Sequence, residues 1–289
     1  MRILFWLLLL SVAVGAVWSS TLTRQERLSD VRAEAASLAA IAAASVDQYV
    51  NGIDAMAVAL IRNPAVVQLN RQECNRLFAG LLGDRSLLVD LALSSPDGAI
   101  LAAGHAVPQN VANAPPAYVR DAVKSARPVV SDLTITQISH KPAIVLAYPV
   151  QREDGGVVAV LSVGIDLLRL HTLFGGVPQD GSVIALTDRI GLVLARSLDP
   201  DRYVGTTLEA PPADRARPST TIKDVDGVER IVKSSPVGSR GWLVHVGIPA
   251  AVVASRLEPG RRRAATISVL AVLGLALWSW RLAWRTPND

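Results

Sequence analysis

Six polar residues of this sequence have side chains that could bind a small molecule. They fall within one stretch, close to the ends of predicted helices and strands, and they are Tyr118, Arg120, Asp132, His140, Tyr148 and Asp166. A tyrosine can stack on a ligand and donate a hydrogen bond, while the other side chains supply charge. Such groups bind ligands where a few of them meet in an apolar pocket. This set therefore indicates a binding site.

Each of these residues also has an ordinary structural explanation. Tyr118 and Tyr148 fit core tyrosines as well as they fit ligand contacts. Asp132 and Asp166 both end predicted strands, where a carboxylate can cap a turn or the helix predicted over Leu167–Leu173.

Two further positive residues are candidates. His140 lies beside Lys141 in a predicted loop, where the pair can attract an anion or simply be solvated. Arg120 is a weaker candidate on a predicted helix.

The patterns that enzymes use are missing. The four histidines lie far apart without a helical metal-binding pair, and the sequence has neither a G-x-S-x-G motif nor a glycine-rich phosphate loop. Asp224 and Asp226 are close together, but Asp224-Val-Asp-Gly227 is typical of a turn between strands. The single Cys74 excludes an internal disulfide or a thiolate metal cluster. We therefore expect no catalysis, no metal and no cofactor.

Composition indicates a membrane protein. Of the 289 residues 50% are hydrophobic and only 19% are charged, and the mean hydropathy is positive. The net charge of +4 is modest, and the arginines are scattered except at 261–263. A nucleic-acid partner is therefore not expected.

Two uncharged segments near the ends are long enough to cross a bilayer, and we predict transmembrane helices at 1–22 and 264–284. The alternative for the first is a cleaved signal peptide with Val14-Gly15-Ala16 at its cleavage site. The long segment between the spans is expected outside the membrane, because segments much longer than about 60 residues are translocated regardless of their charges.

The stretch after the first predicted span, residues 23–83, indicates a long helix and then a short one. Thr23–Asn63 has no proline, one glycine and apolar residues every three or four positions. Pro64 ends this helix, and a capping pattern at Asn70 begins the short one. The alanine-rich part, Ala35–Ala44, allows close approach, so it either forms a homodimer with a second copy or packs on its own domain.

Two β-rich modules follow, at 84–174 and 175–258. In the first, two apolar runs flank a Pro-Asp-Gly turn, a helix begins at the Pro115-Pro116 pair, and further antiparallel strands follow. The second module repeats this pattern, since Leu91–Ala102 aligns without a gap on Ile184–Ala195. The order of elements predicts an α+β fold.

Several short motifs together resemble those of double Cache domains, the tandem PAS-like sensors found outside bacterial membranes. They are Asp97-Gly98, Pro128-Val-Val-Ser-Asp132, Lys141-Pro142, Tyr148-Pro149-Val150, Gly164-Ile165-Asp166 and Val204-Gly205. The resemblance covers Asp47–Leu257. It implies a long first helix, a membrane-distal module that binds a ligand, and a membrane-proximal module coupled to the second span.

The resemblance also implies a location and an output. The chain would cross the bacterial inner membrane twice and hold its sensor in the periplasm. The output would be a histidine kinase, a diguanylate cyclase or a chemoreceptor signalling domain. Only five residues follow Trp284, so we expect the output to lie on a partner or on a longer form of the chain.

The sequence departs from the amino-acid-binding members of this family. Those carry an Arg-x-Trp-Tyr run that holds the ligand carboxylate, but here the stretch reads Pro115-Pro-Ala-Tyr118. Asp166 matches the family aspartate that receives the ligand amine. With one half of the clamp missing, an α-amino acid is not the expected ligand.

The expected function is therefore ligand sensing in a transmembrane signalling receptor. The alternative is a membrane-anchored interaction or regulatory protein with no small-molecule ligand. Convergence of Tyr118, Tyr148 and Asp166 on a cavity would favour the receptor, and apolar filling of that space would favour the alternative.

Overall fold

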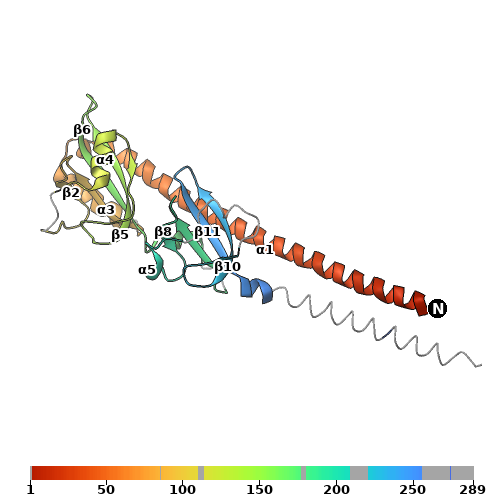
Figure 1. The fold of residues 1–289 in the computed structure, drawn as a ribbon. Helices are drawn as coiled ribbons and strands as arrows, with labels where there is room; N and C mark the ends of the chain where they lie inside the picture. Colours follow the sequence, from red (N-terminus) through yellow and green to blue (C-terminus); the bar gives the residue numbers. More distant parts are fainter. Residues whose placement is uncertain are drawn as a thin grey trace, which may run out of the picture.

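The computed structural model describes residues 2–84, 86–109, 114–176, 180–208, 221–255 and 274. One long helix, α1 (Arg2–Ile61), runs past two antiparallel sheets that follow one another along it (Figure 1). We call the sheet built from β1 to β6 the distal sheet, and the sheet built from β7 to β11, nearer the N-terminal end of α1, the proximal sheet. The predicted α+β fold, with a long first helix and two sheets, is confirmed.

The distal sheet has six strands in the order β2-β1-β6-β5-β3, with β4 also paired to β5. Its strands are β1 (Leu88–Ser94), β2 (Ile100–Ala103), β3 (Val129–Val130), β4 (Thr134–Ile135), β5 (Pro142–Gln151) and β6 (Val157–Asp166). Helices α1, α2 (Pro64–Val67) and α3 (Arg71–Asp84) pack on one side of this sheet, and α4 (Ala117–Ser125) packs on the other.

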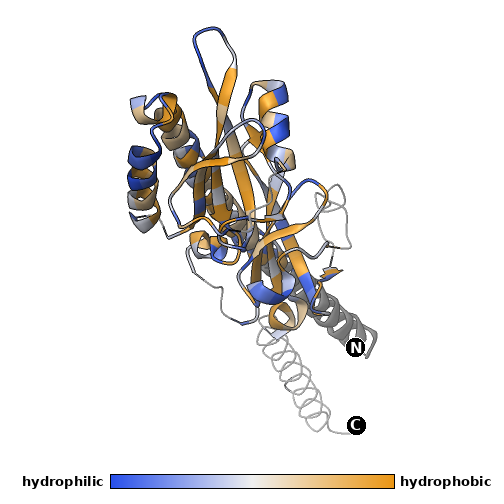
Figure 2. Ribbon diagram, turned by 90° about the vertical axis from the view of Figure 1, so that its left-hand side faces the viewer, coloured by the Kyte–Doolittle hydropathy of each residue, from blue (hydrophilic) through white to orange (hydrophobic). Residues whose placement is uncertain are grey.

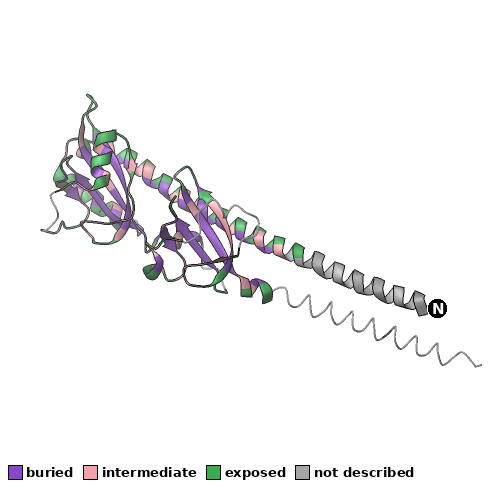
Figure 3. Cartoon of the chain, viewed as in Figure 1, coloured by how far each residue is buried: buried purple, intermediate pink, exposed green. Residues whose placement is uncertain are grey.

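The proximal sheet has five strands in the order β8-β7-β11-β10-β9. They are β7 (Val183–Thr187), β8 (Val193–Arg196), β9 (Thr221–Lys223), β10 (Glu229–Val237) and β11 (Trp242–Pro249), and the short α5 (Pro200–Tyr203) follows β8. Most residues of β1, β5, β6, β7, β8 and β11 are buried (Figure 3), whereas β10 is mostly intermediate and β9 mostly exposed. The strands are also largely hydrophobic (Figure 2).

Strand pairing confirms the internal repeat. Ala92 pairs with Ala103 in the first hairpin, and the aligned Ala185 pairs with Arg196 in the second. Both hairpins then shift register at the same place, just before Ser94 and Thr187. Corresponding residues of the two sheets can therefore be compared position by position.

Helix α1 buries a stripe of small and apolar residues. The described members of this stripe recur every three or four positions: Val31, Ala35, Ala39, Ala42, Ala43, Val46, Val50, Ile53, Ala57 and Leu60. Four alanines of the stretch Ala35–Ala44 are buried within the chain itself (Ala35, Ala39, Ala42 and Ala43), whereas the remaining three are exposed. Ile41 follows the apolar periodicity of the sequence, but it lies outside this stripe and is 59% exposed.

No helix in the part of the chain that the structure describes is both long and apolar enough to cross a membrane. The first predicted span lies where α1 is described without its side chains, and the second lies outside the described residues except for Gly274. Residues 209–220, between α5 and β9, also lie outside them.

One predicted helix takes a different form. The segment expected to be helical over Leu167–Leu173 is a 3-10 helix, η1 (Leu170–Phe174), which ends at Gly175 with a φ of 77°. Asp166 closes the turn that precedes η1, because its carboxylate accepts a hydrogen bond from the backbone N–H of Leu168 at 3.1 Å. The N-cap residue of η1 itself is Arg169, which makes no side-chain cap hydrogen bond, so Asp166 does not cap this helix as the sequence predicted.

Candidate ligand-binding site

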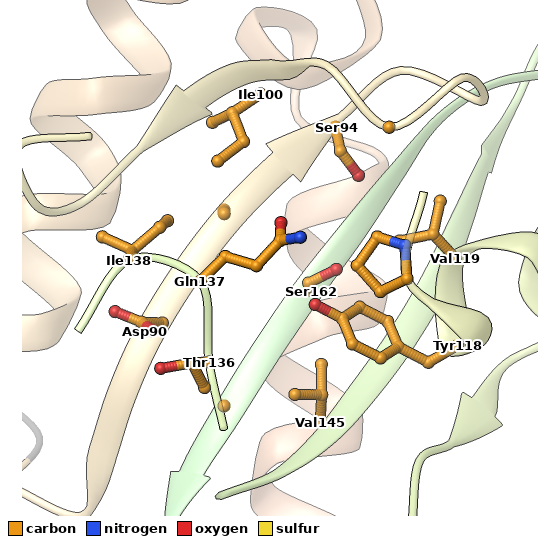
Figure 4. A pocket seen from close by; sticks show the side chains of 14 residues that line it. Asp90, Ser94, Ile100, Tyr118, Val119, Thr136, Gln137, Ile138, Val145 and Ser162 are labelled. Atoms are coloured by element: carbon orange, nitrogen blue, oxygen red, sulfur yellow. The ribbon is translucent and has the colours of Figure 1, made fainter. Parts of the chain in front are cut away.

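A small cavity lies on the α4 side of the distal sheet. It is enclosed by β1, β5 and β6, the β1–β2 turn, the start of α4 and the segment between β4 and β5 (Figure 4). The lining residues are Asp90, Ala92, Ser94, Gly98, Ile100, Pro116, Tyr118, Val119, Thr136, Gln137, Ile138, Val145, Ser162 and Gly164. The cavity has about 40 Å³ of space for the centres of water-sized molecules, which is room for about three waters or a ligand of a few heavy atoms.

Side chains alternate between the two faces of each strand, and this alternation determines which strand residues line the cavity. Along β1, Leu91 and Leu93 belong to the core that packs on α1, while Asp90 and Ser94 line the cavity on the opposite face. β6 behaves in the same way, with Ser162 on the cavity side. Asp90, Ser94 and Ser162 therefore lie on strands whose other face is entirely apolar, while Tyr118, Thr136 and Gln137 come from α4 and the β4–β5 segment.

Asp90 is the only charged residue among the described lining residues. It is 6% exposed. Its Oδ2 accepts hydrogen bonds from the Ser139 hydroxyl at 2.9 Å and from the Ser139 backbone N–H at 3.3 Å. Its Oδ1 is buried and has no hydrogen-bond partner. A buried carboxylate oxygen without a partner is costly, so it needs a structural or functional explanation.

Tyr118 enters the cavity from α4 and lies over the sheet in Figure 4. Burial, and then the negative charge of Asp90, raise the pKa of Tyr118 to about 12. The phenol is therefore a neutral hydrogen-bond donor at physiological pH. Its ring also offers a face on which a ligand can stack.

Gly98 closes the outer edge of the cavity. It turns the β1–β2 hairpin with a φ of 97°, and a Cβ at this position would lie 2.6 Å from the backbone of Pro115. Both the backbone angle and this contact require glycine. The hairpin turn and the start of α4 are thereby held against each other.

Tyr118 is the only one of the six predicted residues that lines this cavity. Tyr148 is buried on the opposite face of β5, where its hydroxyl donates a hydrogen bond to the carboxylate of Asp54 in α1. Burial, and then this hydrogen bond, raise the pKa of Tyr148 far above its ordinary value. Tyr118, Tyr148 and Asp166 do not converge on one cavity, because α1 covers the face of β5 to which Tyr148 belongs.

The other predicted residues lie around the distal sheet. Asp166 is buried at the end of β6, caps the following turn, and lies 3.8 Å from the ammonium of Lys141. His140 is exposed, with a φ of 56°. Arg120 is exposed on α4, where its guanidinium donates to the carbonyl of Pro115 at 2.7 Å. A ligand contact by any of these residues stays a prediction.

Asp132 lies between the two sheets rather than in the distal cavity. It lines a separate hollow of about 160 Å³ together with Arg189, Arg240 and Trp242 of the proximal sheet and its turns. A role of Asp132 in ligand binding stays a prediction.

Sequence reasoning missed Asp90, Ser94, Thr136, Gln137 and Ser162. The signal was present in β1, because Leu88–Ser94 alternates large apolar residues with Asp90, Ala92 and Ser94. Reading that run only as an apolar strand concealed its second, partly polar face.

A second cavity occupies the equivalent place in the proximal sheet. It offers about 630 Å³ for water-sized molecules, and its lining includes Val183, Ala185, Val232, His245 and Gly247. Strand pairing makes these residues the counterparts of Asp90, Ala92, Val145, Ser162 and Gly164. The carboxylate position of the distal cavity is thus occupied by Val183 in the proximal one.

The proximal sheet also contains a buried ion network. Arg196 contacts Asp224 at 3.0 Å and Asp226 at 2.8 Å, and Arg230 contacts the same two carboxylates at 2.9 and 2.6 Å. The Arg196 guanidinium also lies 4.5 Å from the centre of the Tyr203 ring. The paired aspartates that the sequence placed in a turn therefore neutralise two buried arginines.

Among the described residues, no group of three or more His, Cys, Asp or Glu side chains is arranged to hold a metal ion. The arrangement in the distal cavity is suited to binding, since it combines one carboxylate with neutral hydroxyl and amide groups.

Comparison with known proteins supports this fold. No protein-family model matches the sequence, and no curated protein sequence matches it. The chain is similar in structure to the extracellular domain of the putative histidine kinase rpHK1S-Z16, with a TM-score of 0.63 and 17% identity over 79% of this chain and 98% of that one.

Two chemoreceptor domains are also similar. The ligand-binding domain of the Pseudomonas aeruginosa PAO1 amino acid chemoreceptor PctB, in complex with L-Arg, has a TM-score of 0.57 and 20% identity, covering 78% of this chain and 97% of that one. The ligand-binding domain of the Campylobacter jejuni chemoreceptor Tlp3, in complex with L-valine, has a TM-score of 0.55 and 12% identity, covering 81% of this chain and 98% of that one. The chain therefore has the fold of extracellular ligand-binding domains of histidine kinases and chemoreceptors.

Proposed function

We propose that this chain is the extracytoplasmic ligand-sensing region of a bacterial transmembrane signalling receptor, of the double Cache type. The observation that carries the proposal is the distal cavity, because polar groups from β1, β6, α4 and the β4–β5 segment meet there in an otherwise apolar layer. The fold that the chain shares with receptor domains agrees with this reading.

The alternative, an interaction protein with no ligand, predicts that apolar side chains fill this space. The hydroxyl, amide and carboxylate groups of the lining favour the receptor. The convergence of Tyr118, Tyr148 and Asp166, which would also have favoured the receptor, is not found.

The proposal includes the membrane topology read from the sequence. Two spans, at 1–22 and 264–284, would hold both sheets in the periplasm, and the second would carry a displacement from the proximal sheet to an output. Residues 250–255 are helical directly after β11, so a movement of this sheet can pass straight into the segment that precedes that span. The output would be a histidine kinase, a diguanylate cyclase or a chemoreceptor domain.

A homodimer through α1 is part of the same proposal. The buried alanines face the chain's own sheets, so a second copy would contact the opposite face of α1, where Ile41 is exposed.

Thermal melting of the full chain in detergent micelles tests the function. A panel of amines, carboxylates and alcohols of a few heavy atoms would be added, and a compound at a hundredfold its Kd should add about 2.7 kcal/mol to stability. The stabilisation should weaken in Tyr118→Phe and persist in Tyr203→Phe, since Tyr203 lines the proximal cavity. A panel that raises no melting temperature would contradict the receptor function.

A further inference from the structure

We propose that the distal cavity takes a small protonated amine, with its ammonium group bound by Asp90 and its remaining atoms against Tyr118. The inference rests on the proposed function, because it names the chemical class of the ligand that the same cavity would sense.

The contacts of Asp90 leave half of its carboxylate unused. Ser139 donates both its hydroxyl and its backbone N–H to Oδ2, which ties the β4–β5 segment to β1. This structural role accounts for one oxygen. The other, Oδ1, is buried without a partner in a residue that is 6% exposed. An ammonium group, with three donors and a positive charge, supplies what this oxygen lacks.

The charge of the cavity favours the same class of ligand. None of the described lining residues is a lysine, arginine or histidine. Lys141 lies near the end of β6, but it is close to Asp166 and its side chain is 54% exposed. A desolvated carboxylate is stabilised mainly by an opposite charge, so the cavity attracts a cation and repels a carboxylate.

The proximal sheet has an apolar residue at the position equivalent to Asp90. Asp90 pairs with Gly164, and the equivalent pair in the proximal sheet is Val183 with Gly247. The same strand position is therefore compatible with an apolar side chain. Asp90 is a feature of the distal cavity alone, as expected of a residue that recognises a ligand.

Tyr118 completes the site. Its phenol stays neutral and can donate a hydrogen bond, and its ring can stabilise a cation through the π face. The small volume limits the ligand to a few heavy atoms. With no positive lining residue to hold a carboxylate, the ligand is a simple amine or amino alcohol.

Isothermal titration of the full chain in detergent micelles tests the inference. The probes are ethanolamine, ethylene glycol and glycolate, which are similar in size and differ in charge. We expect ethanolamine to bind at least about tenfold more tightly than ethylene glycol, because a hydrogen bond to a charged group is lost in the neutral compound. Glycolate should bind more weakly still.

The variant Asp90→Asn keeps the shape of the side chain and its hydrogen bond with Ser139. Its affinity for ethanolamine should be lower by about tenfold or more. Asp121→Asn, an exposed aspartate on α4, is the matched control and should bind as the unchanged protein does. The comparison of the three probes on the unchanged protein stands even if Asp90→Asn does not fold.

Three outcomes would overturn the inference. Tighter binding of glycolate or ethylene glycol than of ethanolamine would exclude an amine while leaving a ligand-sensing cavity in place. Unchanged ethanolamine binding in Asp90→Asn would exclude this residue as the partner. If none of the probes binds and the wider panel raises no melting temperature, the proposed function fails as well.

Discussion

The hydroxyl of Tyr148, in the distal sheet, donates a hydrogen bond to the carboxylate of Asp54 in α1. The guanidinium of Arg240, in the turn between β10 and β11, donates to the other oxygen of the same carboxylate. One side chain of the long helix therefore joins both sheets. A shift of β5 relative to α1 would disturb a contact of the proximal sheet, which provides a physical route between the two modules.

The hydrogen bond between Tyr148 and Asp54 should be measurable as stability. We expect Tyr148→Phe to lower the free energy of unfolding by about 1 kcal/mol, because the buried donor is removed while Asp54 keeps Arg240. Chemical denaturation of the full chain in detergent measures this change. Tyr203→Phe is the control, and it should change stability by less than about 0.5 kcal/mol. Equal effects of the two variants would mean that the bond adds no stability.

The buried ion network of the proximal sheet should be sensitive to the loss of one arginine. Arg196→Met leaves Asp224 and Asp226 with a single positive partner, so we expect a loss of about 3 kcal/mol in the free energy of unfolding. The exposed Arg189, changed to Met, should cost less than about 0.5 kcal/mol. A loss below 1 kcal/mol for Arg196→Met would show that the network contributes little.

Acid should weaken the proximal sheet through Asp226. Burial alone would raise the pKa of this carboxyl, but the hydrogen bond and charge of Arg230 outweigh it and the pKa is lowered. Between the folded and unfolded pKa values the unfolded chain binds more protons, so the stabilisation is present above pH 4 and is lost as pH falls through the folded value. Denaturation at a series of pH values should show this fall, and Asp226→Asn should make it shallower. An unchanged slope would contradict the assignment.

The phenol of Tyr118 should ionise at a higher pH than an ordinary tyrosine does. Because burial and Asp90 raise its pKa to about 12, the folded state favours the neutral phenol. The stability that it contributes is complete below pH 10 and is lost as pH rises toward 12. The difference in phenolate absorbance between the chain and Tyr118→Phe measures the pKa, and Asp90→Asn should lower it. Ionisation near pH 10 in the unchanged protein would mean that the phenol is not buried beside Asp90.

Local pattern was enough to predict most elements of the fold. The long helix ends at Ile61, just before the Asn63-Pro64 pair, which caps and begins α2. The first hairpin turns on Pro96-Asp-Gly98, and the repeat of Leu91–Ala102 was visible as an alignment. These features depend on residues close together in the chain. Backbone preferences and hydrophobic periodicity therefore determine them without knowledge of the tertiary structure.

The site was predicted less well because it depends on which face of each strand is covered, and by what. No residue near Tyr148 in the sequence indicates that its face of β5 is covered by α1 and not by α4. Asp132 lies between the sheets because the segment after β3 meets residues of the proximal sheet that are distant in the sequence. The alternation in β1 could have indicated that Asp90 lies on the cavity face. Which of its oxygens is paired could not be predicted, because the partner of Oδ2 is Ser139, far along the chain, and Oδ1 has none.

A crystal structure of the full chain, grown with the panel compound that raises its melting temperature most, tests the central claim most directly. The account predicts electron density for that compound in the distal cavity, within hydrogen-bonding distance of Tyr118 and Asp90. Density for the compound only in the proximal cavity, or in the hollow between the sheets, would contradict it.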